Sequence, residues 1–231
     1  MSRASTAEAP PTVEPLGGRD ARRIVADGYD AVAERYFAWS DAQPSRVRRA
    51  WLDRSLELIP PGADALDLGC GAGVPMTRAL ANGRRVTGVD LSARQLELAR
   101  ANVVGATFIQ ADMTALDLPA ASLDAVTAFY SLTHVPRADL ADLLADIHRW
   151  LRPGGLLIAT MGADDSPDEV EVDWLGAPMF FSHYGAKRNR ALVAAAGFEV
   201  LEATIETEPE DRHDARFLWV IARRPEDSSR G

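Results

Sequence analysis

A glycine-rich run and an acidic residue that follows it are the part of this chain best suited to chemistry. The run reads Ala65-Leu66-Asp67-Leu68-Gly69-Cys70-Gly71-Ala72-Gly73, and Asp90 ends the next apolar stretch. Glycines lack the Cβ that blocks a sharp turn and a close approach to a ligand. The helix expected from about Val74 offers unpaired N–H groups to that ligand. A carboxylate at Asp90 suits a bidentate grip on two ribose hydroxyls, so these residues predict a nucleoside-binding site.

The glycine spacing indicates which nucleoside. The dinucleotide fingerprint G-x-G-x-x-G makes room for a pyrophosphate, whereas this loop reads G-x-G-x-G with Asp67 before the first glycine. A carboxylate repels a pyrophosphate and attracts an ammonium group. The pattern therefore favours a ligand with a positive charge near the loop and a ribose near Asp90. S-adenosyl-L-methionine meets both requirements, and a nicotinamide dinucleotide is disfavoured.

The run resembles the glycine motif of class I S-adenosylmethionine-dependent methyltransferases, and four further motifs follow in that family's order. Val89-Asp90-Leu91-Ser92 resembles the ribose-binding strand end, and Gln110-Ala111-Asp112-Met113 resembles the adenine-binding turn. Leu123-Asp124-Ala125-Val126 resembles the fourth strand, and Leu151-Arg152-Pro153-Gly154-Gly155 the turn before the fifth. The resemblance covers roughly residues 24–224. It is closest to the small-molecule group that includes the ubiquinone and menaquinone methyltransferases.

The resemblance also implies a set of cofactor contacts. Asp67 and the glycines hold the amino acid end of S-adenosyl-L-methionine, and Asp90 holds the ribose. Asp112 accepts a hydrogen bond from the adenine amine. The cofactor-binding residues expected are Tyr29, Tyr36, Asp67, Gly69, Cys70, Gly71, Gly73, Asp90, Leu91, Gln95, Asp112, Met113 and Phe129.

Strand and helix patterns alternate along the chain and must position these residues. Helices are expected at 20–39, 46–58, 74–81, 93–102, 139–151 and 186–196, and strands at 64–68, 86–90, 107–110, 125–130 and 156–161. Such alternation predicts an α/β, Rossmann-like, doubly wound sheet. Two last runs, 199–206 and 217–222, flank a polar turn and predict an antiparallel hairpin. The resemblance implies seven strands, mostly parallel, with the last antiparallel.

The domain organisation follows from composition. Residues 1–18, rich in proline and glycine, are expected to be a disordered leader, and residues 225–231 a disordered tail. Residues 19–224 then form one methyltransferase domain, with lid pieces at about 20–40 and 163–184. The sequence has no signal-peptide core and no apolar run long enough to span a membrane, which favours the cytoplasm.

The charge and the cysteine and histidine content exclude several classes of function. A net charge of −9 disfavours binding to a nucleic-acid backbone. Cys70 is the only cysteine, so it is expected to fill space in the loop rather than act as a nucleophile. The four histidines lack paired ligand spacing, so no metal is predicted, and His148 and His213 are expected at the surface.

Methyl transfer from a sulfonium needs alignment first and a base only where the acceptor loses a proton. His134, just past the fourth strand, is a candidate base or substrate partner, with a structural role equally open. His183, with Tyr184, is the preferred base candidate, again with a structural role open. Tyr29 and Tyr36 lie on the expected lid helix. They either contact the cofactor or the substrate, or belong to the core.

The segment 163–184 is too long for a simple connection and is expected to be an irregular lid. Its apolar half, 174–181, predicts a pocket wall for a flat or hydrophobic acceptor, and some of its aromatic rings are expected to pack the segment onto the sheet. Its acidic half, 164–169, is interpreted as a solvated face, with attraction of a cationic amine as the sharper alternative.

These patterns predict transfer of a methyl group from S-adenosyl-L-methionine to a small organic acceptor. An arginine-rich composition with the single lysine Lys187, together with the aromatic residues of the expected lid, suggests a secondary metabolite. Two alternatives remain at this point: another reaction on the same fold, such as a cyclisation, and a cofactor-binding module without turnover. The expected partner is a small molecule, with neither a nucleic acid nor a membrane. The sequence does not indicate the oligomeric state or whether the acceptor atom is oxygen, nitrogen or carbon.

Overall fold

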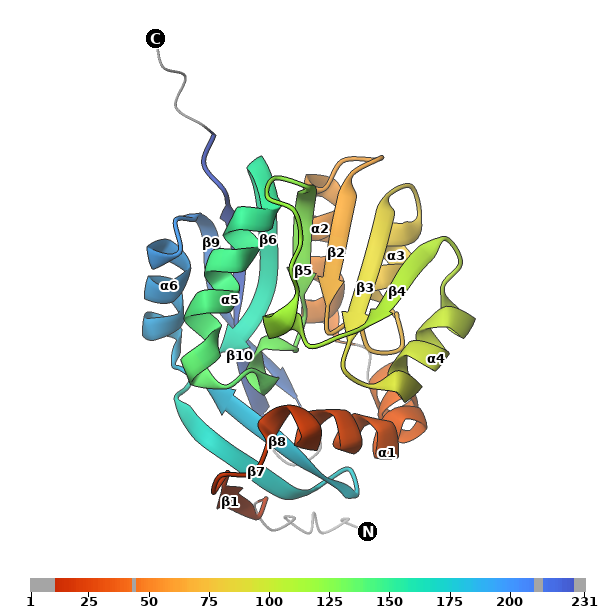
Figure 1. Ribbon diagram of the computed structural model, residues 1–231, viewed down its shortest axis with the longest axis vertical. Helices are drawn as coiled ribbons and strands as arrows, with labels where there is room; N and C mark the ends of the chain where they lie inside the picture. Colours follow the sequence, from red (N-terminus) through yellow and green to blue (C-terminus); the bar gives the residue numbers. More distant parts are fainter. Residues whose placement is uncertain (1–10, 43–44, 210–213, 227–231) are drawn as a thin grey trace, which may run out of the picture.

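The computed structural model describes residues 11–42, 45–209 and 214–226. Its centre is a seven-stranded sheet in the order β4-β3-β2-β5-β6-β10-β9 (Figure 1). The strands are β2 (Asp64–Leu68), β3 (Arg85–Asp90), β4 (Ala106–Gln110), β5 (Leu123–Ala128), β6 (Leu151–Gly162), β9 (Glu199–Pro209) and β10 (Asp214–Arg223). Strands β2 to β6 pair in parallel, and β10 is antiparallel to both β6 and β9. The predicted fold class is confirmed.

Helices cover both faces of this sheet. On one face α5 (Arg137–Trp150) and α6 (Ala186–Ala195) pack on a core that contains Leu66 and Leu68. On the other, α2 (Arg46–Leu58) and α3 (Met76–Ala81) pack on a core that contains Ala65. Side chains alternate between the two faces of a strand, so a strand covered on both sides is apolar throughout.

The expected N-caps position two helices. Ser45 Oγ accepts from the N–H of Arg48 at 2.9 Å, and α2 begins at the next residue. Ser92 Oγ accepts from the N–H of Gln95 at 3.0 Å, and α4 (Ala93–Asn102) begins there. Such caps satisfy N–H groups that the first helical turn leaves unpaired. Other boundaries differ slightly: α3 begins two residues later than expected, and β5 ends at Ala128, before Tyr130 turns to a φ of 60°.

The first helix, α1 (Ala21–Ala42), lies across the carboxyl ends of the central strands (Figure 1). It packs closely against a hairpin from the second expected lid piece. At Gly28 a Cβ would come within 2.6 Å of the carbonyl oxygen of Pro178, so only glycine allows this approach. The two lid pieces therefore form one packed unit.

The segment 163–184 is regular, which corrects the expectation of an irregular lid. It forms the hairpin of β7 (Ser166–Trp174) and β8 (Ala177–His183), joined through Leu175 and Gly176, which both have positive φ. Acidic residues alternate with apolar ones along β7, and Val170 is fully buried. This period of two indicates a strand with one buried face, but the acidic and proline-containing composition obscured it.

The expected leader also contains structure. Strand β1 (Val13–Pro15) pairs antiparallel with β7 and completes a three-stranded sheet in the order β1-β7-β8. Disorder through residue 18 is therefore wrong for these residues, because the open edge of β7 supplies backbone partners for them. The rest of the expected leader before residue 11, the tail beyond residue 226 and His213 lie outside the described residues. No helix among the described residues is both long and apolar enough to cross a membrane.

Candidate active site

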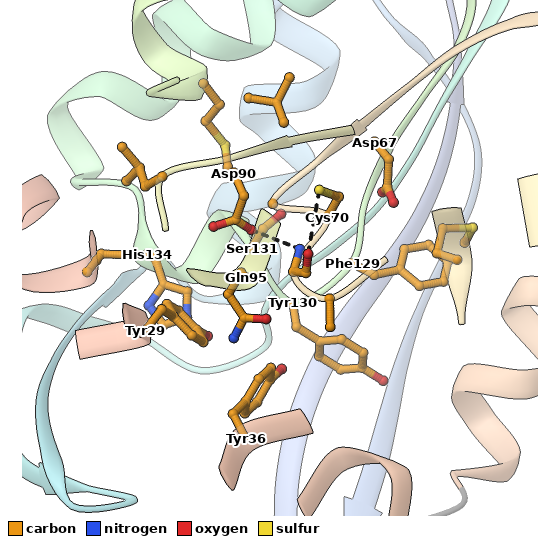
Figure 2. Close-up of a pocket in the computed structure, with 18 of the residues that line it drawn as sticks. Tyr29, Tyr36, Asp67, Cys70, Asp90, Gln95, Phe129, Tyr130, Ser131 and His134 are labelled. Carbon is orange, nitrogen blue, oxygen red and sulfur yellow. Dashed lines mark hydrogen bonds between the residues drawn. The ribbon is translucent and has the colours of Figure 1, made fainter. Parts of the chain in front are cut away.

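A cavity, here called the loop cavity, opens at the carboxyl ends of β2, β3 and β5 (Figure 2). The glycine loop between β2 and α3 forms part of its wall. Thirteen of the sequence-predicted site residues line it: Tyr29, Tyr36, Asp67, Gly69, Cys70, Gly71, Asp90, Leu91, Gln95, Asp112, Met113, Phe129 and His134.

Two of the loop glycines have different reasons to lack a side chain. Gly69 has a φ of 69°, and a Cβ there would come within 2.2 Å of Ser131 Cβ, across the mouth of the loop. Gly73 has a φ of 78°, but its Cβ would meet Val103 Cγ2 at 2.7 Å. Gly73 therefore lets the loop pack against the end of α4. It is not among the residues that line the loop cavity.

The carboxylate of Asp90 is held by the backbone in a position to bind a diol. Its Oδ2 accepts from the N–H of Gly71 at 2.8 Å, and its Oδ1 accepts from the N–H of Ser92 at 2.9 Å. Each carboxylate oxygen has two lone pairs, so each retains one acceptor site. Burial raises the pKa of Asp90 to about 6, which leaves it mainly ionised at neutral pH. Two neighbouring hydroxyls, as on a ribose, match this arrangement.

Gln95 is an unpaired polar group in the same cavity wall. The side chain is 1% exposed, and neither its Nε2 nor its Oε1 has a hydrogen-bond partner among the residues that the structure describes. Figure 2 shows it beside Asp90 and the glycine loop. Buried amides in folded proteins are nearly always paired, so an unpaired one at a cavity indicates a missing polar ligand. S-adenosyl-L-methionine carries hydroxyl, amino and carboxylate groups and fits this requirement.

Replacing Gln95 by leucine is expected to have opposite effects on ligand affinity and on stability. Loss of one or two hydrogen bonds should weaken binding of S-adenosylhomocysteine by about tenfold. The melting temperature of the ligand-free protein should stay the same or rise, because two buried unpaired polar atoms disappear. Calorimetric titration and thermal denaturation measure the two effects. Unchanged affinity would show that the amide does not touch the ligand.

Asp67 is more enclosed than the resemblance suggested. It is 3% exposed, and its two oxygens accept from Thr77 Oγ1 at 2.5 Å and Thr127 Oγ1 at 2.8 Å. Burial raises its pKa to about 6. These bonds tie the end of β2 to α3 and β5. The contact of Asp67 with the cofactor's amino acid end stays a prediction.

The expected adenine side contains an arginine that the sequence analysis missed. Asp112 Oδ1 accepts from the N–H of Thr114 at 2.9 Å, and its Oδ2 accepts from Arg22 Nε of α1. Arg22 also pairs with Asp139 at 2.8 Å. Helix α1 is thereby anchored to the loop after β4. No local pattern reveals this contact, because ninety residues separate Arg22 from Asp112.

His134 connects the lid helix to the hairpin. Its Nδ1 lies 2.7 Å from the carbonyl oxygen of Phe180, and its Nε2 lies 2.9 Å from the hydroxyl of Tyr29. A carbonyl only accepts, so Nδ1 carries the proton and Nε2 accepts from Tyr29. Burial lowers the pKa of His134 to about 4, so the ring is neutral at pH 7. With both nitrogens engaged, the geometry favours the structural alternative for His134.

A second cavity of about 1080 Å³, here called the aromatic cavity, adjoins the loop cavity. Trp39, Trp174, Phe181 and Phe217 contribute apolar walls. Six residues line both cavities: Tyr29, Tyr36, Ser40, Arg48, Tyr130 and His134. Their shared position defines the junction between the two spaces.

The two remaining catalytic candidates lie in different places. His183 lines the aromatic cavity, and its Nδ1 is 2.7 Å from the carbonyl oxygen of Asp164. Tyr184 lines neither cavity, because its ring packs under the guanidinium groups of Arg137 at 4.8 Å and Arg188 at 5.7 Å. The structure therefore does not bring Tyr184 to the site.

Cys70 and Phe129 fill the base of the loop cavity. Burial, with Asp90 and Asp67 nearby, raises the pKa of the Cys70 thiol above its usual range, so it stays protonated. A thiol in this state suits the expected space-filling role. Phe129 packs edge-on against Trp219 at 4.8 Å. Within the described ranges, no three histidine, cysteine or carboxylate side chains gather as a metal site requires.

A sheet of this order, with an acidic strand end facing a glycine loop, defines the nucleoside-binding methyltransferase fold. Comparison with protein families agrees, because residues 65–155 match the family described as "Methyltransferase domain". The chain belongs to the class I S-adenosylmethionine-dependent methyltransferases, and its cofactor is S-adenosyl-L-methionine.

Individual proteins similar to this chain are also named methyltransferases. The chain is 33% identical to a malonyl-[acyl-carrier protein] O-methyltransferase of Enterobacter lignolyticus, over 66% of this chain and 59% of that protein. It is 31% identical to a ubiquinone/menaquinone biosynthesis C-methyltransferase of Rhizobium etli, over 68% of this chain and 66% of that protein. In both cases the match spans less than two thirds of the relative. A crystal structure of an S-adenosylmethionine-dependent methyltransferase from Mesorhizobium loti is 26% identical, with a TM-score of 0.59, over 73% of this chain and 94% of that one.

Proposed function

We propose that this protein transfers the methyl group of S-adenosyl-L-methionine to a small organic acceptor with a flat or hydrophobic body. The junction of the two cavities carries the proposal, since six side chains line both. A cofactor in the loop cavity and an acceptor in the aromatic cavity can therefore meet. When bound, S-adenosyl-L-methionine supplies an electrophilic methyl group on a sulfonium.

The protein's contribution is binding, orientation and exclusion of water. Asp90 holds the ribose, and Gln95 gives hydrogen bonds to a polar group of the cofactor. The lid tyrosines Tyr29 and Tyr36 cover the junction, with their rings 5.3 Å apart. An in-line displacement depends on such alignment and on a water-free site.

The aromatic cavity supports the choice of acceptor. Rings such as Tyr36 and Trp39, stacked at 5.9 Å, suit a flat apolar molecule. The relatives' names cover both O- and C-methylation of small or carrier-bound molecules. The arginine-rich composition with one lysine, together with the aromatic rings of this cavity, supports secondary metabolism as the setting.

Product mass tests the proposed reaction. The protein is incubated with S-adenosyl-L-methionine and a panel of small aromatic acceptors, and products are analysed by mass spectrometry. A product heavier by one methyl group, together with S-adenosylhomocysteine, supports methyl transfer. A product of unchanged mass with the cofactor intact would indicate a cyclisation, and cofactor binding without any product would indicate a binding module.

His183→Ala is expected to slow turnover by about a hundredfold without changing the affinity for S-adenosylhomocysteine, if His183 is the base. The reason is its place on the aromatic cavity, away from the cofactor contacts. His148→Ala is the matched control, because His148 packs on Phe198 outside both cavities. Steady-state rates and calorimetry separate the two effects. Full activity in His183→Ala would remove His183 from the chemistry.

A further inference from the structure

A buried carboxylate lies in the wall of the aromatic cavity, on an element that the proposed mechanism does not use. Glu208, near the end of β9, is 8% exposed and lines this cavity. The hydroxyl of Tyr130 donates to its Oε1 at 2.6 Å. Among the described residues, Tyr130 is the donor to this carboxylate. A carboxylate can accept about four hydrogen bonds in all. Burial of a carboxylate is costly unless hydrogen bonds compensate, so Glu208 has capacity for a further donor.

The surrounding structure fixes Tyr130 firmly. Its φ of 60° is unusual for a residue with a side chain, and its N–H donates to Thr160 Oγ1. Its ring packs edge-on against Phe217 at 5.0 Å and Trp219 at 5.6 Å. Such backbone strain persists only where the surroundings enforce it and is concentrated at functional sites. Burial and the Glu208 carboxylate raise the pKa of Tyr130 above its usual range, so Tyr130 remains a donor to Glu208.

Several other charged groups in the wall of the aromatic cavity have partners of their own. Arg216 binds Asp164 at 2.8 Å, and Glu169 accepts from Ser166 at 2.5 Å. Arg48 lines both cavities and donates to the carbonyl oxygen of Ser40 at 3.1 Å. Its positive charge is close enough to Tyr130 to oppose part of the rise in the pKa of that residue. The aromatic cavity thus presents the carboxylate of Glu208 as an acceptor between aromatic walls, and the guanidinium of Arg48 lies at the junction.

The charges indicate which donor fits. A protonated amine is repelled by Arg48 and by the sulfonium of the cofactor. A phenolic hydroxyl is neutral, donates strongly to a carboxylate, and gains negative charge that Arg48 stabilises. A flat ring carrying such a hydroxyl also matches the apolar walls.

We propose that Glu208, held in place by Tyr130, determines acceptor specificity by accepting the hydrogen bond of a phenolic hydroxyl in the aromatic cavity. This inference deepens the proposed function and rests on the aromatic cavity being the acceptor site. Tyr130 acts as a positioning residue for Glu208. The acceptor class is therefore a hydroxylated aromatic compound.

The test compares two probes, 1-naphthol and 1-methoxynaphthalene, in the second of which a methyl group replaces the donor hydrogen. Each is titrated by calorimetry into the full-length protein saturated with S-adenosylhomocysteine. The wild type should bind 1-naphthol at least about tenfold more tightly, as expected for a charge-assisted hydrogen bond. Glu208→Gln should reduce this ratio to about threefold or less, and Glu208→Leu should abolish or reverse it. Glu202→Gln, on an exposed position of the same strand, should leave the ratio unchanged.

Several outcomes would overturn the proposal: equal affinity of the two probes in the wild type, failure of both to bind, or the same preference in the Glu208 variants. Thermal denaturation establishes that each variant is folded, and the two Glu208 variants provide independent chances of a folded protein. Affinity for S-adenosylhomocysteine should be the same in all of them. A wild type that binds no S-adenosylhomocysteine would instead contradict the proposed function itself.

Discussion

Asp90→Asn is expected to weaken the binding of S-adenosylhomocysteine by at least about a hundredfold. The two carboxylate oxygens each have one acceptor site left for a ribose hydroxyl, and each charge-assisted bond contributes about 1.5–3 kcal/mol. Asparagine keeps the shape but removes the charge. Its NH₂ group also replaces an acceptor and faces the N–H of either Gly71 or Ser92. Isothermal titration calorimetry of the purified variant measures the change.

An exposed aspartate provides the control for this experiment. The side chain of Asp117 is 97% exposed, and its contact with Arg149 is long, at 3.6 Å. Asp117→Asn changes the net charge by the same amount and should leave the affinity unaltered. If Asp90→Asn bound the ligand within about threefold of the wild type, Asp90 would not be the ribose site, and the assignment of the loop cavity would be wrong.

Gly69→Ala is expected to destabilise the protein by roughly 2–5 kcal/mol and to abolish measurable cofactor binding. The left-handed backbone at this residue costs about 1–2 kcal/mol for a residue with a Cβ. The new Cβ would also lie 2.2 Å from Ser131 Cβ, so backbone on at least one side must shift. Overpacking of this kind costs about 1–3 kcal/mol. Thermal denaturation should show a melting temperature lower by roughly 5–15 °C.

Gly83→Ala separates the cost of the left-handed backbone from the cost of the collision with a neighbouring side chain. Gly83 has a φ of 96°, yet a Cβ there would meet nothing within 4 Å. It carries the backbone cost without the collision, so a loss of about 1 kcal/mol and normal cofactor binding are expected. Equal losses at Gly69 and Gly83 would mean that the loop yields to the added Cβ. The close approach to Ser131 would then have no bearing on function.

The elements that the sequence predicted well depend on short-range signals. Strand β2 and helices α2 and α4 have the predicted bounds, because an apolar run or a serine cap lies within a few residues of each end. The position of Asp90 follows in the same way, since it ends β3 one residue before a turn. The places of Asp67 and Asp90 at the ends of their strands could therefore be predicted from the sequence alone.

Contacts between distant segments could not be predicted. Arg22 reaches Asp112 from the lid helix, and Glu208 reaches Tyr130 across 78 residues. Neither pair has a local pattern. For Tyr184 the sequence was misleading in the other direction. Tyr184 follows His183 directly, which suggested that it lies in the site, but its ring packs against Arg137 and Arg188 outside both cavities. Adjacent residues at the end of a strand point to opposite sides.

The tight contact of Gly28 with Pro178 bears on how acceptor preference could be exchanged between proteins of this kind. The family match, residues 65–155, contains the glycine loop, Asp90, Gln95 and Asp112. Apart from Tyr130 and His134, the rings of the acceptor side come from segments before and after it, as does Glu208. A chimaera that kept the central portion could therefore acquire a new substrate range by grafting of the flanks. Helix α1 and the β7–β8 hairpin must be transplanted together. A helix with a side chain at the position of Gly28 would collide with the backbone at Pro178.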